Sequence, residues 1–338
     1  MNRTFFMQEA IKEAQKANIK DIVPNPFVGC VIVKNNQIIS RGYHQKYGEA
    51  HAEINALNAL KSDIKNADMY VTLEPCNHDG KTPACSKQII DSRKIKRIYY
   101  ASKDPNINAT GGHGTLENAG IKISQGLCDK DAQKINKRFF TFHLKKRPYV
   151  ILKYASTADG FIAKNNGESK WITKEDARKD VHILRSTCDA ILVGRRTIEF
   201  DNPKLTSHGQ GRDPKVIILS SKKAYSQYNV MKSNPLIFSC ERNFKSPKEN
   251  LKIILDNLFK ENVQSLIVEG GGKTITSFIK SNFFDEIHAY ISPKKFGQGI
   301  PFYDGDNFDD ILKNFELVQQ VNFKVDMKKV YVKKCLLD

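Results

Sequence analysis

Residues 51–53 read His-Ala-Glu, and residues 74–85 read Glu-Pro-Cys-Asn-His-Asp-Gly-Lys-Thr-Pro-Ala-Cys. A catalytic zinc ion takes three protein ligands and keeps a fourth position open. One imidazole and two thiols meet that count, at His51, Cys76 and Cys85. Glu53 follows two residues after the histidine, in the first turn of a predicted helix, so both side chains can face one pocket. The pairing of His-x-Glu with Pro-Cys therefore predicts a zinc site at which the carboxylate of Glu53 transfers protons.

Two other interpretations of these residues stay open. A closed structural zinc site would need a fourth Cys or His, and His78 is the only candidate nearby in the sequence. Alternatively, His51 caps a helix and the two cysteines belong to the hydrophobic core. The catalytic interpretation is favoured because the pairing of His-x-Glu with Pro-Cys is specific. Zinc in such a site lowers the pKa of bound water to about 7, which provides the nucleophile that hydrolytic loss of a ring amine requires.

Alternating strands and helices surround the motif. Strands are predicted at residues 28–33, 37–41, 69–73, 97–101 and 121–124, with Asn35-Asn36 as a hairpin turn between the first two. Helices are predicted at residues 51–61, 84–92 and 129–145, and residues 1–20 have the apolar spacing of an amphipathic helix. This pattern predicts an α/β sandwich for the first half of the chain.

A charge cluster that ends in proline, residues 145–148, marks a boundary, after which the pattern restarts. Strands are predicted at residues 149–155, 190–193, 215–219, 266–269, 286–291 and 329–335. Helices are predicted at residues 174–186 and from the Gly270-Gly271-Gly272 turn to residue 280. We therefore expect two α/β domains, residues 1–146 and 147–338.

Composition limits the class of protein. A chain of 338 residues has room for two domains with separate cores. No apolar run approaches the ~18 residues that span a bilayer, and seven scattered cysteines do not form a disulfide framework, so a cytoplasmic location is expected. The net charge of +17 suits anionic partners, but the lysines are spread along the chain with no dense tract, which favours a drift in base composition over a charge selected for nucleic acid. Phosphorylated small molecules are compatible with either explanation.

The motif also resembles a known family. His-Ala-Glu followed by Pro-Cys is typical of zinc nucleoside and base deaminases, most of which continue Pro-Cys-x-x-Cys. Here eight residues separate the cysteines, and the chain also has Pro24-Asn25-Pro26 and Gly42-Tyr43-His44. This combination resembles the deaminase domain of the bifunctional riboflavin biosynthesis deaminase/reductases, from which Asp79, Ala84 and Ile107 are modest departures. The resemblance implies substrate contacts by Asn25, His44, Asn77, His78, Lys81, Asp104 and Asn106.

The second half lacks the Gly-x-Gly-x-x-Gly fingerprint of a standard dinucleotide site. Its segments at residues 149–155, 169–173, 189–194 and 201–206, in this order, resemble the reductase domain of the same family, which is related to dihydrofolate reductase. The resemblance implies NADPH contacts by Ala155, Trp171, Thr197, Asp201, Ser220, Gly270, Gly271 and Gly272. It implies substrate contacts by Lys153, Ser169, Arg185, Leu205 and Glu269, with His208 at the position of a family arginine that contacts phosphate.

The resemblance implies two consecutive reactions. A diaminopyrimidinone carrying a phosphoribosylamino group would lose ammonia at the zinc site, and NADPH would then reduce its ribosyl group to ribityl. A homodimer or homotetramer is expected from the family. Two alternatives remain, a zinc deaminase of nucleic acid such as tRNA, and an active deaminase joined to a non-catalytic C-terminal module.

Overall fold

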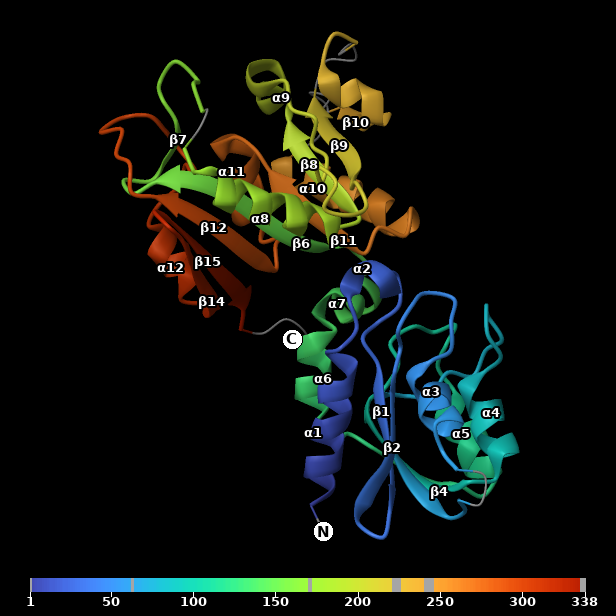
Figure 1. Ribbon diagram of the computed structural model, residues 1–338. Helices are drawn as coiled ribbons and strands as arrows, with labels where there is room; N and C mark the ends of the chain where they lie inside the picture. Colours follow the sequence, from blue (N-terminus) through green and yellow to red (C-terminus); the bar gives the residue numbers. More distant parts are fainter. Residues whose placement is uncertain (1, 62–63, 170–171, 221–225, 240–245, 335–338) are drawn as a thin grey trace. The chain divides into compact units, whose positions relative to one another are not determined.

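The computed structural model describes the chain except residues 1, 62–63, 170–171, 221–225, 240–245 and 335–338 (Figure 1). It divides into two compact units, Met1–Leu144 and Lys145–Asp338, each of which combines a sheet with helices on both faces. Among the described residues, no helix is long and apolar enough to cross a membrane.

The N-terminal unit holds five strands and seven helices in the described residues. Its strands are β1 (Gly29–Lys34), β2 (Gln37–Tyr43), β3 (Ala67–Leu73), β4 (Ile95–Ser102) and β5 (Lys122–Gln125). Its helices are α1 (Arg3–Ala14), α2 (Ile19–Ile22), α3 (Ala52–Asn58), α4 (Cys85–Ser92), α5 (Gly112–Asn118), α6 (Asp129–Ile135) and α7 (Lys137–Lys145). The sheet order is β2-β1-β3-β4-β5, with β3, β4 and β5 parallel and β1 antiparallel to both of its neighbours.

The alternation of side chains along the strands builds two apolar layers. Cys30 and Ile32 of β1 point to the face that packs against α3, α4 and α5. Val31 and Val33 point to the opposite face, which packs against α1 and α6. The predicted hairpin is also confirmed, because β1 and β2 pair antiparallel across Asn35 and Asn36, which both adopt positive φ.

Glycine allows α3 to lie close against β2. A Cβ atom at Gly42 would stand 2.4 Å from the Ala52 carbonyl oxygen and 2.4 Å from the Ala56 nitrogen. Any other residue would push the helix away, since real Cβ atoms do not approach backbone so closely. The glycine thereby fixes the start of α3, where His51 and Glu53 lie.

The helix predicted over residues 129–145 is broken at Asn136 into α6 and α7. The buried side chain of Asn136 accepts a hydrogen bond from the Phe27 nitrogen at 2.7 Å and donates one to the Phe27 oxygen at 2.8 Å. These tertiary bonds pair the backbone of the segment that precedes β1. Their cost is a non-helical backbone at Asn136, with φ −115° and ψ 24°.

The C-terminal unit has a larger, mostly parallel sheet. Its strands are β6 (Tyr149–Thr157), β7 (Phe161–Ala163), β8 (Ala190–Gly194), β9 (Lys215–Ser220), β10 (Leu236–Ser239), β11 (Ser265–Glu269), β12 (Glu286–Ser292), β13 (Ile300–Pro301), β14 (Phe315–Phe323) and β15 (Asp326–Lys333). Its helices are α8 (Glu175–Ser186), α9 (Arg195–Asp201), the short 3₁₀ helix η1 (Asn229–Ser233), α10 (Pro247–Lys260), α11 (Gly272–Ser281) and α12 (Phe308–Leu312).

Eight of these strands form one sheet in the order β10-β9-β8-β11-β6-β12-β15-β14. The first six are parallel, whereas β15 and β14 add an antiparallel edge. Helices α8 and α9 cover one face, and α10 and α11 cover the other (Figure 1). Because parallel strands share a direction, the carboxyl ends of β6, β8, β9 and β11 meet at one edge of the sheet, where ligands bind in such folds.

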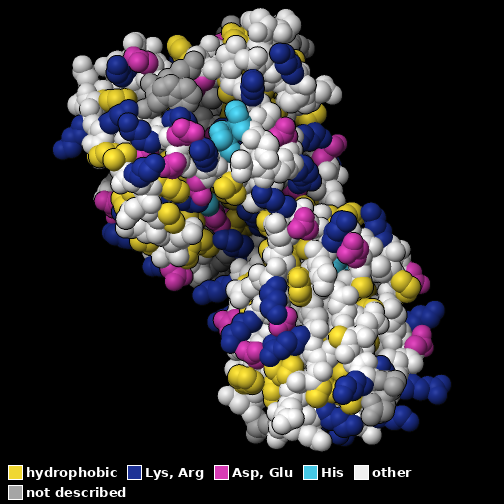
Figure 2. Space-filling model, viewed as in Figure 1, with side chains coloured by type: hydrophobic (Ala, Val, Ile, Leu, Met, Phe, Trp, Pro, Cys, Tyr) yellow, Lys and Arg dark blue, Asp and Glu magenta, His cyan; other side chains and the backbone are white. Residues whose placement is uncertain are grey.

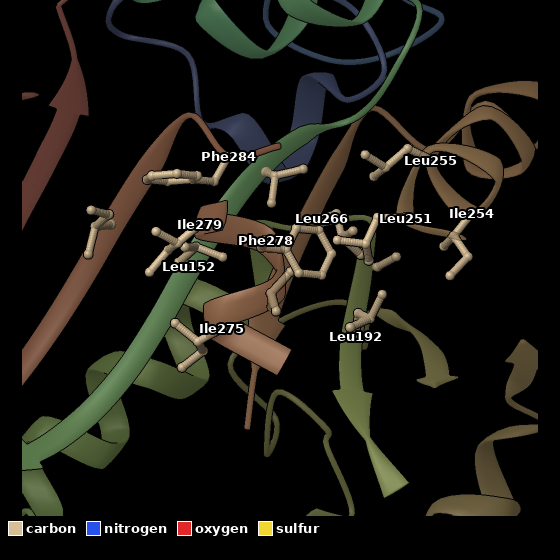
Figure 3. Close-up of a cluster of buried hydrophobic side chains, with 14 of the residues drawn as sticks. Leu152, Leu192, Leu251, Ile254, Leu255, Leu266, Ile275, Phe278, Ile279 and Phe284 are labelled. Carbon is tan, nitrogen blue, oxygen red and sulfur yellow. The ribbon is translucent and has the colours of Figure 1, made fainter. Parts of the chain in front are cut away.

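The apolar side chains of α10 and α11 form a core layer with β6, β8 and β11 (Figure 3). Phe278 and Ile275 of α11 are fully buried there, beside Leu266. Two neighbouring isoleucines of α10 have opposite environments, because Ile254 is 4% exposed within this layer and Ile253 is 42% exposed outside it.

This pair provides a matched test of the core. We expect Ile254→Ala to lower the free energy of unfolding of the C-terminal unit by about 2–5 kcal/mol, and Ile253→Ala to change it by less than about 0.5 kcal/mol. Urea unfolding can be followed by the fluorescence of Trp171, the only tryptophan of the chain. Equal losses in the two variants would contradict this assignment of the core.

Candidate functional site

The three predicted metal ligands lie together in the N-terminal unit. His51 is the residue before α3, Cys76 follows β3, and Cys85 is the first residue of α4. Nδ1 of His51 lies 3.2 Å from Sγ of Cys85 and 3.6 Å from Sγ of Cys76, and the three ligand atoms all lie within 4.8 Å of one another. Zinc bond lengths place tetrahedral N and S ligands roughly 3.5 Å apart, so this donor set fits a zinc ion.

The pKa values of the two thiols are shifted in opposite directions. The side-chain hydrogen bond with Cys85 lowers the pKa of Cys76 to about 4, and the same bond, together with burial, raises the pKa of Cys85. The Cys85 backbone N–H also points at Sγ of Cys76, at 3.4 Å. A thiolate is thus already favoured at one ligand, and zinc binding would displace the proton of the other.

A fourth protein ligand is not found at this cluster. Among the described residues, the group that could hold a metal comprises only His51, Cys76 and Cys85. His78, the candidate for a closed site, is exposed and belongs to the lining of the adjoining cavity. The arrangement therefore keeps one coordination position for a water or a substrate, as catalytic zinc sites do.

Glu53 is buried beside the ligands, in the first turn of α3. Burial raises the pKa of its carboxyl to about 7, because the charged form loses its hydration. A proton carrier works best when its pKa lies near the operating pH. The position and environment of Glu53 both suit proton transfer in this cavity.

A cavity of about 450 Å³ opens onto the cluster. Its lining brings together His51, Glu53 and Cys76 with six of the residues predicted to contact substrate, namely Asn25, His44, His78, Lys81, Asp104 and Asn106. Asn77 does not line it. The side-chain oxygen of Asn77 accepts a hydrogen bond from the Ser86 hydroxyl at 2.8 Å, and the backbone N–H of Asn77 donates to the Ala109 oxygen at 3.0 Å.

Asn25 and His44 form one side of the cavity. The Asn25 amide nitrogen lies 3.1 Å from Nε2 of His44, whose Nδ1 lies 3.3 Å from the Ala50 oxygen. The His44 ring is perpendicular to that of His51, with the centroids 5.3 Å apart. Burial lowers the pKa of His44, so the ring is neutral at pH 7 and serves the cavity as a hydrogen-bonding group.

The mouth of the cavity carries a cation over an aromatic ring. The Lys81 ammonium stands 4.1 Å from the centroid of Tyr47, and both residues line the cavity. A Cβ atom at Gly48, whose φ is +85°, would come within 3.2 Å of the Lys81 side chain. Tyr47 was not among the predicted site residues; only its proximity in the fold identifies it as the support of Lys81.

Asp104 and Asn106 lie on the segment that follows β4. The Asp104 side chain accepts a hydrogen bond from the Asn106 nitrogen at 2.8 Å. Burial raises the pKa of Asp104 to about 7. The segment is therefore a folded wall of the cavity.

Three of the predicted residues of the C-terminal unit form one cluster of charged side chains. Arg185 of α8 donates two hydrogen bonds to the Glu269 carboxylate, at 2.8 and 2.9 Å, and the Lys153 ammonium lies 3.7 Å from the same carboxylate. Burial alone would raise the pKa of Glu269, but Arg185 and Lys153 lower it to about 2. The cluster is a buried, charged unit with one excess positive charge.

The glycine turn after β11 packs against α9. The Gly271 nitrogen donates to Oγ1 of Thr197 at 3.2 Å, and a Cβ atom at Gly270 would stand 2.7 Å from the same oxygen. Nothing lies within 4 Å of a Cβ atom built at Gly271, whereas one at Gly272 would stand 2.3 Å from the Pro301 oxygen, so the open side of the turn is at Gly271. Such a turn at a helix N-terminus fits the phosphate of a dinucleotide.

The other predicted residues of this unit have varied surroundings. Ser169 donates a hydrogen bond to Asp201 at 2.7 Å, Ser220 is buried at the end of β9, and Ala155 of β6 pairs with β12. Leu205 is buried in the core layer under α8 and α9. Trp171 lies outside the described residues.

His208 stacks on a second histidine that the predictions had not included. The rings of His182 and His208 lie 4.0 Å apart at 29°, and the buried Nδ1 of His182 has no hydrogen-bond partner among the described residues. Burial, followed by the charge of Arg185, lowers the pKa of His182 to about 4 and lowers that of His208. Figure 2 shows histidine side chains at the surface of this unit, and Lys and Arg interspersed with Asp and Glu over the visible face.

Comparison with known sequences matches both units. The profile of the cytidine and deoxycytidylate deaminase zinc-binding region matches residues 1–102, and that of the RibD C-terminal domain matches residues 148–329. The riboflavin biosynthesis protein RibD of Aquifex aeolicus is 40% identical over 301 residues, which cover 83% of this chain and 84% of that protein. The protein of the same name from Escherichia coli is 33% identical and covers 88% of this chain and 89% of its own length.

Solved structures give the same result. The diaminohydroxyphosphoribosylaminopyrimidine deaminase/5-amino-6-(5-phosphoribosylamino)uracil reductase of Thermotoga maritima is 34% identical, with a TM-score of 0.79 over 98% of both chains. RibD of Acinetobacter baumannii is 30% identical, with a TM-score of 0.83 over 98% of both chains.

The ligand assignment has a direct test in metal content. We expect Cys76→Ser to lose most of its zinc, because a serine hydroxyl is a poor zinc ligand at neutral pH. Cys128→Ser should keep about one zinc ion per chain, because Cys128 lies at the start of α6, outside the cluster. Metal analysis of both purified proteins after dialysis gives the answer; full retention of zinc by Cys76→Ser would show that this thiol is not a ligand.

Proposed function

Because this chain belongs to the family of bifunctional riboflavin biosynthesis deaminase/reductases, we propose that its two units act in turn on one phosphoribosylated pyrimidine. The family combines a zinc-dependent deaminase with an NADPH-dependent reductase, so the predicted fold class, activities and cofactors are confirmed. The match covers the second half as well as the first, which disfavours both a nucleic-acid deaminase and a non-catalytic C-terminal module.

The proposed first substrate is 2,5-diamino-6-(5-phosphoribosylamino)pyrimidin-4-one. Water replaces one ring amino group, which leaves as ammonia, and a uracil ring results. The open imine form of the ribosyl group in the deaminated product then receives a hydride at carbon and a proton at nitrogen, and becomes a ribityl chain. The two activities in the name of the Thermotoga maritima protein support this proposal, and the observation that carries it here is a cavity that joins His51, Cys76 and Glu53 to polar side chains.

We assign the deaminase chemistry to residues 1–146. A zinc ion held by His51, Cys76 and Cys85 would supply Lewis-acid activation of water. Glu53, with a pKa of about 7, takes one proton from the water and gives it to the ring nitrogen, and then carries a second proton from the added hydroxyl group to the departing amine. Asn25, braced by His44, is placed to hydrogen-bond an edge of the pyrimidine. Lys81, exposed at the mouth, suits the phosphate.

We assign the reduction to residues 147–338. NADPH supplies the hydride. Gly270, Gly271 and Gly272 open α11 and suit a cofactor phosphate, next to Thr197 and the Ser169–Asp201 pair. The Lys153–Glu269–Arg185 cluster faces the substrate with a fixed orientation, because its members hold one another. A cytoplasmic location and a homodimer or homotetramer complete the proposal; reduced thiols at the metal cluster suit that compartment.

The roles of the two units can be separated with Glu53→Gln. We expect this variant to lose deamination by about 10²–10⁴-fold, because glutamine keeps the shape of the side chain but transfers no proton. Ammonia release from the diaminopyrimidine measures the first reaction, and NADPH absorbance measures the second. When the deaminated product is supplied directly, the variant should oxidise NADPH at the wild-type rate.

The same assay contains its own controls. If Glu53→Gln releases ammonia normally, the carboxylate is not the proton carrier. If the wild type releases ammonia but never oxidises NADPH, the C-terminal unit is not a reductase of this product.

The histidine pair predicts a pH dependence of the reductase. Both pKa values are lowered, so His182 and His208 are neutral at pH 7 without substrate. A bound phosphate raises the pKa of a nearby imidazole, so binding takes up a proton and the affinity increases as the pH falls. We expect the KM for the deaminated product to rise about tenfold between pH 6 and pH 8, relative to His208→Arg, whose charge is permanent.

The phosphate of the substrate also titrates in this pH range, but it does so equally for both proteins. Dividing the KM of the wild type by the KM of His208→Arg at each pH therefore cancels this contribution. A wild-type profile parallel to that of His208→Arg would mean that no imidazole proton is coupled to substrate binding.

A further inference from the structure

Glu74 is a buried carboxylate that none of the assigned roles uses. It follows β3 directly, two residues before Cys76, and is 3% exposed. Among the described residues, no basic side chain forms an ion pair with it. A buried carboxylate without a cation must be stabilised by hydrogen bonds, or it costs several kcal/mol.

Four donors from one segment provide that stabilisation. Oε2 accepts from the Asp104 nitrogen at 3.3 Å and from the Thr110 hydroxyl at 3.0 Å. Oε1 accepts from the Gly111 nitrogen at 3.1 Å and from the His113 nitrogen at 3.2 Å. Each carboxylate oxygen thus accepts two hydrogen bonds, and both ends of the segment 104–113 are bound to the side chain of Glu74.

The same segment packs tightly against the loop that carries Cys76. A Cβ atom at Gly112 would stand 1.8 Å from the Pro75 oxygen, so only glycine fits there. The Asn77 nitrogen donates to the Ala109 oxygen at 3.0 Å. The wall of the cavity that bears Asp104 and Asn106 therefore contacts the metal-binding loop at several residues, and Glu74 makes most of the hydrogen bonds between them.

We propose that Glu74 is a positioning residue of the deaminase, which holds the 104–113 wall at the distance from the metal ligands that the pyrimidine requires. The inference rests on the proposed function of the cavity and goes beyond it: Glu74 belongs to the lining of the cavity, but the four hydrogen bonds that its side chain accepts all come from residues 104–113. A carboxylate is needed at this place because a glutamine would turn an NH₂ group toward two of the four donors. The wall would then shift, while the cluster of His51, Cys76 and Cys85 stays intact.

Glu74→Gln in the full-length, zinc-loaded enzyme tests this. We expect the KM for the diaminopyrimidine to rise about tenfold and kcat to change less than about threefold, since a small displacement of a binding wall weakens substrate binding. Zinc content should remain near one ion per chain. Reduction of supplied deaminated product should keep its wild-type rate, because the C-terminal unit has its own core. Glu117→Gln, an exposed glutamate of α5, is the matched control and should behave as wild type.

A second variant keeps the test valid if Glu74→Gln does not fold. Thr110→Val removes one of the four donors without changing the size of the side chain, and should raise the same KM by a smaller factor, about two- to fourfold. A lower melting temperature with an unchanged KM in these variants would overturn the proposal, because the role would be structural only. Loss of zinc would overturn it as well, since Glu74 would then act through the metal. A wild type that releases no ammonia would instead refute the proposed function itself.

Discussion

The close approach of α3 to β2 at Gly42 is the constraint on which the deaminase site depends. It brings the start of α3 to the sheet, so that His51 reaches the two thiols and Glu53 is buried beside them. A side chain at position 42 would move the imidazole and the carboxylate together, because both belong to the first turn of one helix. The metal binding that we propose for His51 and the proton transfer that we propose for Glu53 therefore both depend on the packing contact at Gly42.

The C-terminal unit organises its site through charge. Glu269, Arg185 and Lys153 come from β11, α8 and β6, and the hydrogen bonds between them leave little freedom for any one side chain. Burying such an ion cluster contributes little to stability, but it gives a fixed orientation to the groups that we propose contact the substrate. The excess positive charge matches the phosphate that the proposed substrate carries.

Much of this could be predicted from the sequence, for identifiable reasons. His51, Glu53, Cys76 and Cys85 could be selected because they are residue types typical of a zinc deaminase, and they occur in the order that such enzymes have. The hairpin of residues 28–41 could be predicted from the Asn35-Asn36 turn. Helix α10 was missed although Leu251, Ile254, Leu255 and Leu258 show helical spacing after the Ser246 cap and Pro247. The break at Asn136 could not be predicted, because it depends on Phe27, more than a hundred residues away. Tyr47 likewise has no local signal, whereas the adjacency of Glu74 to Pro75 and Cys76 could have directed attention to it.

Among the residues that the structure describes, each sheet contains strands of one unit alone, and each unit has its own apolar layers. In this part of the chain neither sheet includes a strand of the other unit, so the described folds do not require that the two units share a polypeptide. Joining the two units in one chain does, however, have a consequence for the cell. One translation event yields one deaminase and one reductase, so the ratio of the two enzymes is fixed at unity and cannot drift with the expression of separate genes.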